Sequence, residues 1–242
     1  MFGKFLSTLL FVFLLFASGG NVVKADGSFA VPQQAAEISI VKIQYADNNS
    51  KAFIPQISGM SDASLMAVIN TNLRNAILKL ANPPTGSSLH GDAEVAFANA
   101  QLLGLHFTGD SFTPGTPHAN KIDCGLHIDL TTGKIYALAD LFKPGVNFEK
   151  YIQELCRGNN LKYRMVITGL WDGWTPQVFA DCWTQTDGAF LLQAHSLRVY
   201  AIPSYATGVI SGYSIPYDDL MDIIDTNGQL WKQIQGGNNL DG

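Results

Sequence analysis

Apolar and polar residues alternate along several stretches of the chain, a pattern typical of β-strands that bury one face. In the clearest stretch every second side chain is apolar, at Ile122, Cys124, Leu126, Ile128 and Leu130. Thr131-Thr132-Gly133 predicts a turn after it, and residues 135–138 predict the returning strand of a hairpin. Shorter alternating stretches predict strands at 37–46, 52–54, 95–97, 103–107, 189–192 and 197–202. We expect the strand at 52–54 to end at Pro55.

Three further stretches show the spacing of helices. Residues 61–80 place a row of apolar side chains on one face, and Ser61 or Asp62 is suited to cap the free N–H groups. Residues 148–156 also predict a helix, with Asn147 as its cap. A third helix is predicted over 216–224, with Pro216 in its first turn. Separate strands and helices without βαβ alternation predict an α+β fold, in which antiparallel sheets pack against two to three helices.

The first 25 residues have the organisation of a secretory signal peptide. Lys4 precedes an almost unbroken apolar run over 5–17, and Val23 and Ala25 suit a cleavage site before Asp26. The run is shorter than the ~20 residues that a membrane-spanning helix needs. We therefore expect a periplasmic or secreted protein that is not held in the membrane after cleavage.

The composition is that of a folded protein, with 47% hydrophobic and 14% charged residues among 242. The 15 basic and 20 acidic residues give a net charge of -5 and form no Lys and Arg cluster, so we expect no nucleic-acid partner. Without residues 1–25, which contain Lys4 and Lys24, 13 basic and 20 acidic residues remain. A net charge near -7 favours a cationic partner over an anionic one.

The chain has three cysteines, Cys124, Cys156 and Cys182. In an oxidising compartment an odd number allows at most one internal disulfide and leaves a spare thiol. Cys124 lies in the clearest predicted strand and is expected in the core. Cys156 and Cys182 are then the pair that we expect to be bridged.

Polar side chains at Asp123, His127 and Asp129 share one face of the same strand. Residues two apart lie about 6.6 Å apart, close enough for His127 and Asp129 to share a metal ion. They lack a third ligand in a recognisable motif, so the simpler interpretation is the polar face of a half-buried strand. We expect no metal, no cofactor and no catalytic residue. His106 and His118 flank a predicted turn segment over 108–117.

Three of the four tryptophans, Trp171, Trp174 and Trp183, lie close together in the sequence. On an exposed loop such residues could stack on sugar rings or anchor a protein partner. In a core they would only fill space. The sequence leaves both interpretations open.

Several strings resemble a known family of extracytoplasmic domains. Residues 129–134 (DLTTGK) and 138–142 (LADLF) are similar to the "DL-x-TGK…L-x-DLF" signature of RsiV-type domains, domain-of-unknown-function family 3298. Residues 197–208 and 215–220 resemble that family's "YEIAPYAAG…IPY-x-x-L" end. Upstream, residues 54–59, with Ile69 and Asn70 after them, resemble the companion family 4163, which has a "YPQ-x-x-G" strand and a helix carrying "IN".

The resemblance implies an α+β fold with two intimately joined subdomains. A 4163-like subdomain is expected over 26–107 and a 3298-like subdomain over 108–235, followed by a flexible tail over 236–242. Two positions depart from the family pattern: Ala201 replaces its usual Glu, and Ser204 replaces its Pro. Residues 114–118 keep the His of the family's "GGAH" turn but not its paired glycines.

Members of these families include the lysozyme-sensing part of an anti-sigma factor and the non-catalytic part of some peptidoglycan deacetylases. The resemblance therefore implies a non-enzymatic protein that binds a protein partner, such as a lysozyme, or peptidoglycan at the cell envelope. We expect the binding residues to be Trp171, Trp174, His118 and Tyr205. Two alternatives stay open: a wall-polysaccharide hydrolase or metalloenzyme acting through the His/Asp face, and a stand-alone structural or lysozyme-inhibitor module.

Overall fold

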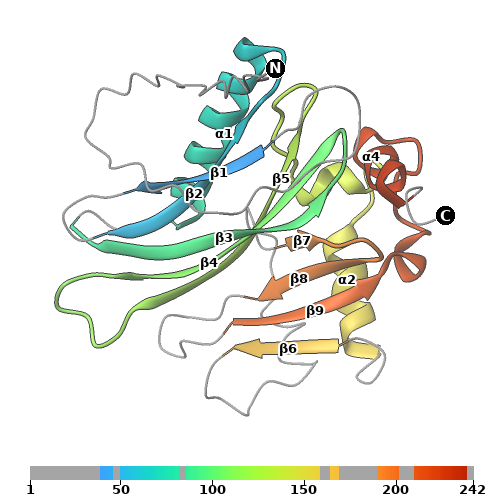
Figure 1. Cartoon of the computed structure of the whole chain (residues 1–242). Coiled ribbons are helices and arrows are strands. Elements are labelled where there is room, and N and C mark those ends of the chain that lie inside the picture. The colour runs from blue at the N-terminus through green and yellow to red at the C-terminus, as the bar shows by residue number, and fades with distance from the viewer. Residues whose placement is uncertain are drawn as a thin grey trace, which may run out of the picture.

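The computed structural model describes residues 39–45, 50–81, 86–158, 164–168, 190–201 and 210–238. Within these residues the chain forms two β-sheets and three α-helices, which confirms the predicted α+β class (Figure 1). In this part of the chain, none of the helices combines the length and the apolar character needed to cross a membrane.

The first sheet has five strands in the order β1-β2-β3-β4-β5. Neighbouring strands run antiparallel except β2 and β3, which pair in parallel at Lys51 and Ala52. This sheet is therefore mixed, whereas the sequence predicted antiparallel sheets. Its strands are β1 (Ser39–Tyr45), β2 (Lys51–Ser58), β3 (Ser88–Ala98), β4 (Leu102–Phe112) and β5 (Asn120–Asp129).

Helix α1 (Ala63–Ala81) covers one face of the first sheet. Its buried Ile69, Leu73 and Ile77 pack against apolar side chains of β2 to β5 and form one core of the protein. The helix begins after Asp62, whose Oδ1 accepts the N–H groups of the second and third residues that follow, each at 2.9 Å. The predicted helix and its cap at Asp62 are confirmed.

The second sheet has the order β6-β9-β8-β7 and is antiparallel throughout. Its apolar side chains form a second core with helices α2 and α4. Helix α2 begins at the predicted cap, because the Oδ1 of Asn147 accepts the N–H of Lys150 at 3.0 Å. The elements are β6 (Arg164–Thr168), β7 (Phe190–Leu192), β8 (Ser196–Ala201), β9 (Ile210–Pro216), α2 (Phe148–Gly158) and α4 (Gln229–Asn238).

The two sheets meet where β7 passes over the face of β5 that points away from α1. The contact is so close that a Cβ atom on Gly125 would overlap the carbonyl oxygen of Phe190. Every residue from Cys124 to Leu130 is buried as a result. The prediction of a half-buried strand is wrong, because the second sheet covers the side that was expected to face solvent.

Two strand boundaries differ from the sequence prediction. Strand β2 continues through Pro55 to Ser58, since beyond Ala52 its registered partner is β1 alone, and a strand paired on one side tolerates proline. The predicted hairpin after β5 is reduced to a single bridge between Ile128 and Ile135. The chain then turns into a short 3-10 helix, η1 (Leu138–Leu141).

The predicted helix over 216–224 is wrong. Pro216 instead ends β9, where it pairs with Ser196, and only a 3-10 turn follows, η3 (Tyr217–Leu220). Ile224 then forms a bridge with Phe142, which draws the chain away from a helical path. Helix α4 ends at Asn238, inside the segment predicted to be a flexible tail over 236–242; the flexibility of that segment stays a prediction.

The predicted boundary between residues 107 and 108 lies inside β4, so the first sheet is continuous across it. The division of the chain between two families stays a prediction.

The cysteines are placed in both cores. Cys124 is a buried free thiol in the first core, as predicted. Cys156 is a buried free thiol in the second core, and Cys182, its expected partner, lies outside the described residues, so the pairing stays a prediction. Burial raises the pKa of both buried thiols to about 12, which makes them poor nucleophiles.

Candidate functional site

His127 and Asp129, the two residues that the sequence offered as metal ligands, are buried where the two sheets meet. The Nε2 atom of His127 accepts the backbone N–H of Leu192 at 2.9 Å, and the ring stacks on Phe190 with centroids 4.6 Å apart. Burial lowers the pKa of His127 from 6.5 to about 3, so the imidazole is neutral at ordinary pH. Its Nε2 joins the two sheets and is not free for a metal ion.

Asp129 closes the turn that follows β5. Its carboxylate accepts bonds from the N–H and the hydroxyl of Thr131, at 2.7 and 2.6 Å, and from the hydroxyl of Tyr136 at 3.1 Å. Burial alone would raise the pKa of Asp129, but the hydrogen bonds to its carboxylate, above all those from Thr131, hold it below its usual value. In the described ranges, no three His, Cys, Asp or Glu side chains lie close enough to hold a metal ion.

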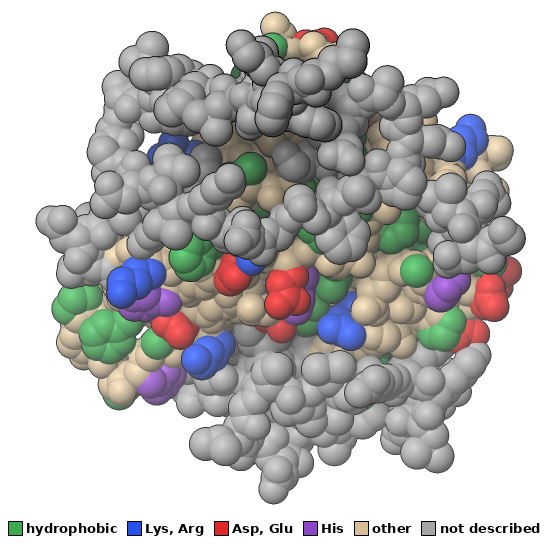
Figure 2. All heavy atoms as spheres, viewed as in Figure 1, with side chains coloured by type: hydrophobic (Ala, Val, Ile, Leu, Met, Phe, Trp, Pro, Cys, Tyr) green, Lys and Arg blue, Asp and Glu red, His purple; other side chains and the backbone are tan. Residues whose placement is uncertain are grey.

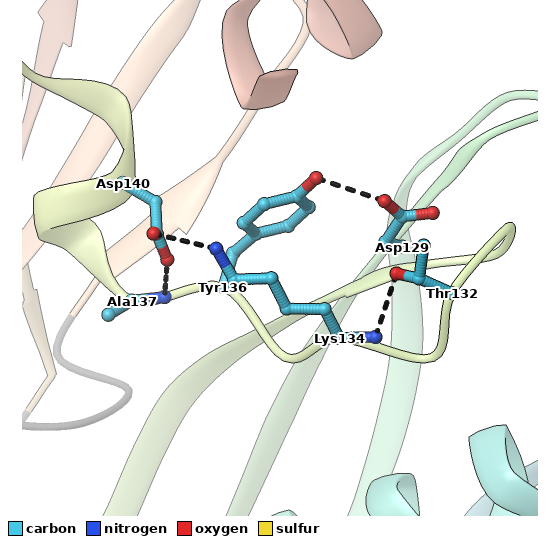
Figure 3. A network of polar contacts seen from close by, with 6 residues as sticks. All are labelled: Asp129, Thr132, Lys134, Tyr136, Ala137 and Asp140. Atoms are coloured by element: carbon cyan, nitrogen blue, oxygen red, sulfur yellow. Dashed lines mark hydrogen bonds and ion pairs between the residues drawn. The ribbon is translucent and has the colours of Figure 1, made fainter. Parts of the chain in front are cut away.

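Figure 3 shows how the string that carries the family resemblance is held together. The Nζ atom of Lys134 lies 2.8 Å from Oδ1 of Asp140 and 4.8 Å from the centre of the Tyr136 ring. The other oxygen of Asp140 accepts the N–H of Ala137 at 2.8 Å, and the Tyr136 hydroxyl points toward Asp129 (Figure 3). These residues stabilise a turn and the 3-10 helix η1, which is a structural role.

A cavity of about 380 Å³ lies beside this network, between η1, the start of α2 and the start of α4. Its charged lining consists of Lys134, Lys143, Asp140 and Asp225. Lys134 is paired with Asp140, and the Nζ of Lys143 donates to the backbone oxygen of Asp222 at 2.7 Å. The four charges in its wall sum to zero, so the net charge of the lining favours neither an anion nor a cation.

A second polar cluster lies where the sheets meet and is reached by solvent. His106 on β4 and Asp123 on β5 are joined by a 2.6 Å contact between Nε2 and Oδ1. The hydroxyl of Tyr200, from β8 of the other sheet, lies 3.4 Å from the same nitrogen. The side chains of His106 and Asp123 are 20% and 14% exposed. The cluster therefore combines near-complete burial with one open side.

The electrostatics of this cluster are mixed. Burial and the negative charge of Asp123 raise the pKa of Tyr200, while Arg198, two residues before it on β8, acts in the opposite direction. Glu94 is exposed and is the registered partner of His106 across β3 and β4. Charged and histidine side chains gather along the middle of the face shown in Figure 2. Chemically, the cluster can accept or donate protons and can offer nitrogen and oxygen ligands.

The hairpin of β4 and β5 carries the third candidate surface. In Figure 1 its turn projects away from the second sheet. Phe112 at the end of β4 is 40% exposed, and His118 in the turn is exposed as well. The turn is held by a 2.7 Å bond between the hydroxyls of Ser87 and Thr113, and by the hydroxyl of Thr116, which donates to the backbone oxygen of Thr113 at 2.7 Å.

Of the residues predicted to bind a partner, His118 is the one within the described ranges. Trp171, Trp174 and Tyr205 lie outside them, so their part in a binding surface stays a prediction. His118 is not close to His106, because more than four residues separate them along the hairpin, about 15–20 Å at the rise of a strand. The predicted turn over 108–117 is shorter than expected, since β4 continues to Phe112.

The sequence did not indicate Tyr200 as a partner of His106 and Asp123. Tyr200 lies near the end of β8, and nothing in the local pattern shows which strand of the other sheet it faces. The alternation of β4 and β5 does place His106 and Asp123 on the face away from α1. That signal could have identified two of the three residues.

Comparison with protein-family models gives no match, and comparison with curated proteins gives none either. Solved structures do match. A DUF3298 family protein from Bacteroides fragilis aligns over 84% of this chain and 98% of its own, with a TM-score of 0.53 and 14% identity. One from Pseudomonas aeruginosa aligns over 81% and 96%, with a TM-score of 0.50 and 17% identity. Over about four fifths of its length, the chain is thus similar in fold to proteins of the DUF3298 family.

Proposed function

We propose that the chain is an exported, non-enzymatic binding protein of the cell envelope, which recognises a protein partner such as a lysozyme or a wall glycan. The signal-like residues 1–25, the net charge near -7 without them and the likeness to DUF3298 proteins all support this proposal. A strongly cationic partner would be attracted by the negative charge.

The projecting hairpin is the observation that carries the proposal. Its turn exposes Phe112 and His118, and it is held by the bond of Thr116 to Thr113 and by the bond of Thr113 to Ser87, which lies before β3. A loop that is ordered before binding loses little conformational entropy in the complex, and an exposed aromatic ring supplies contact area. Binding surfaces are commonly built in this way, on loops held by a rigid sheet.

The alternative of a hydrolase or metalloenzyme through the predicted His/Asp face has less support. His127 is neutral, buried and bonded to the other sheet, and Asp129 is used to close a turn. To react, His127 or Asp129 would have to leave the core, which breaks the junction between the sheets.

The test is direct binding of the chain from Asp26 onward to a purified lysozyme, by calorimetry, and to insoluble peptidoglycan, by co-sedimentation. The double variant Phe112→Ala/His118→Ala should weaken binding at least about tenfold without changing Tm, since both side chains are exposed. The control is Met221→Ala, which removes an exposed apolar side chain after η3, at 38% exposure. Absence of binding to both ligands, or unchanged binding of the double variant, would refute the proposal.

Export is tested separately. The exported protein should begin at Asp26, with the sequence Asp-Gly-Ser, when its N-terminus is sequenced. Folded, exported protein that still carries Met1 would contradict the proposed location.

A further inference from the structure

We propose that His106, Asp123 and Tyr200 bind a divalent transition metal ion of the Zn²⁺ class in the junction between the two sheets. This site is separate from the hairpin surface and does not depend on the proposed function. It is carried by the convergence of three donor atoms, one nitrogen and two oxygens, from three strands of two sheets.

The distances suit a shared ion. The Nε2 of His106 lies 2.6 Å from Oδ1 of Asp123 and 3.4 Å from the hydroxyl oxygen of Tyr200. Around tetrahedral Zn²⁺, ligand atoms at about 2.0–2.1 Å from the ion lie roughly 3.3–3.4 Å from one another. The His–Tyr separation has this value already. The His–Asp separation must open by about 0.7 Å, within reach of a side-chain rotation.

The scaffold is rigid and leaves one side open. All three residues lie within strands, and the rings of His106 and Tyr200 are nearly parallel, at 10° with centroids 6.3 Å apart. Tyr200 is buried, whereas His106 and Asp123 reach solvent. An ion can therefore enter from the open side and keep a water molecule as its fourth ligand, as in zinc sites with three protein ligands.

Binding of the ion requires protons to move at His106 and Tyr200. When the ion occupies Nε2, the imidazole proton moves to Nδ1. The Asp123 oxygen exchanges a hydrogen bond for the ion. The Tyr200 oxygen binds with loss of its proton to solvent; burial and the charge of Asp123 raise the pKa of Tyr200 and oppose that loss, and the positive charge of the ion favours it.

The charged side chains around the site have a net negative charge, which favours a cation. Asp123 and the exposed Glu94, which is opposite His106, supply two negative charges against the one positive charge of Arg198. A mixed set of one imidazole nitrogen and two oxygens suits Zn²⁺ or Co²⁺ and is a poor match for Ca²⁺ or Mg²⁺, which prefer oxygen ligands alone.

The same sheet offers a matched control. The Nδ1 of His90 lies 3.6 Å from Asp110, and both side chains are considerably more exposed than the His106 pair. Lys121 occupies the other side of Asp110 at 3.5 Å, where a cation would be repelled. His90→Ala therefore removes a histidine that is paired with a carboxylate but is not part of the proposed site.

The experiment titrates Zn²⁺ by calorimetry into the chain from Asp26 onward after treatment with a chelator, and records the visible spectrum with Co²⁺. We expect one strong site per chain and the intense absorption of four-coordinate Co²⁺. His106→Ala and Asp123→Asn should each weaken binding at least about tenfold. Tyr200→Phe should weaken it as well and alter the Co²⁺ spectrum, and His90→Ala should bind like the unaltered chain.

Absence of a site in the unaltered chain, or equal binding by His106→Ala, would overturn the proposal. The Co²⁺ spectrum of the unaltered chain is informative even if a variant fails to fold, since six-coordinate, weakly absorbing Co²⁺ would also overturn it. No envelope ligand is present in these measurements. Their failure therefore leaves the hairpin proposal standing, and failure of lysozyme and peptidoglycan binding leaves the metal site standing.

Discussion

Asn70 on α1 satisfies both backbone groups of Ile57 on β2. Its Oδ1 accepts the N–H of Ile57 at 2.7 Å, and its Nδ2 donates to the carbonyl oxygen of Ile57 at 2.9 Å. β2 pairs with β3 only where the strand begins, at Lys51 and Ala52. Further along, the amide of Asn70 takes the place of a neighbouring strand and ties the helix to the sheet.

Replacing Asn70 with Ala should lower the free energy of unfolding by about 1–3 kcal/mol, because the N–H and C=O of Ile57 lose their partners in a partly buried place. Urea unfolding measures the change. Asn75→Ala, on the exposed side of the same helix, is the control and should change it by less than about 0.5 kcal/mol. Equal effects of the two variants would show that the Asn70 bonds add nothing.

Gly125→Ala should disrupt the junction between the sheets. The added methyl group would overlap the backbone of Phe190, and neither strand can move without displacing its own sheet. We expect a loss of at least about 3 kcal/mol or failure to fold. Gly115→Ala is the matched glycine change: its φ is 91° and nothing lies within 4 Å of the new methyl group, so only the backbone cost of about 1 kcal/mol applies. If thermal unfolding showed Gly115→Ala to be more destabilising than Gly125→Ala, this would contradict the close contact between Gly125 and Phe190.

His127 should make the protein sensitive to acid. Above pH 6.5 its imidazole is neutral in both the folded and the unfolded chain and adds no pH dependence. Between pH 6.5 and about 3 the unfolded chain binds a proton that the folded protein does not, because burial lowers the pKa of His127 to about 3. Each pH unit in this window therefore removes up to about 1.4 kcal/mol of stability.

The measurement compares the free energy of unfolding at pH 6.5 and pH 4.5 in the unaltered chain and in His127→Gln. The carboxylates contribute equally in the two proteins. Between pH 6.5 and pH 4.5 the free energy of unfolding of the unaltered chain should therefore fall by about 2–3 kcal/mol more than that of His127→Gln. We expect His127→Gln to be less stable at every pH, so the quantity to compare is the slope of the free energy of unfolding against pH in the two proteins. Equal slopes would mean that His127 is hydrated and charged in the folded protein.

Changing Trp171 and Trp174 together to Ala separates the two interpretations that the sequence left open. If both rings contact a partner, binding should weaken while Tm stays nearly unchanged. If both fill a core, each change should cost roughly 3–5 kcal/mol at full burial. A large loss of stability would remove these residues from the proposed binding surface.

The sequence by itself determined the elements whose pattern is local. The helical spacing before residue 81 and the cap at Asp62 predicted α1, and Asn147 predicted the start of α2. Strict alternation predicted β5, and the likeness of short strings to family 3298 agrees with the similarity in fold to two solved structures of that family. These features follow from backbone geometry over a few residues, which a sequence pattern records directly.

Only the tertiary structure decided what covers each face. Alternation separates the two sides of β5 but does not show that β7 covers the second side, so His127 was expected at a polar surface and lies in a core. The same crossing brings Tyr200 to His106, 94 positions away. Pro216 likewise ends a strand instead of beginning a helix, because pairing with Ser196 outweighs the local preference. Contacts between distant segments are set by packing and hydrogen bonding of the whole chain, and local periodicity carries no information about them.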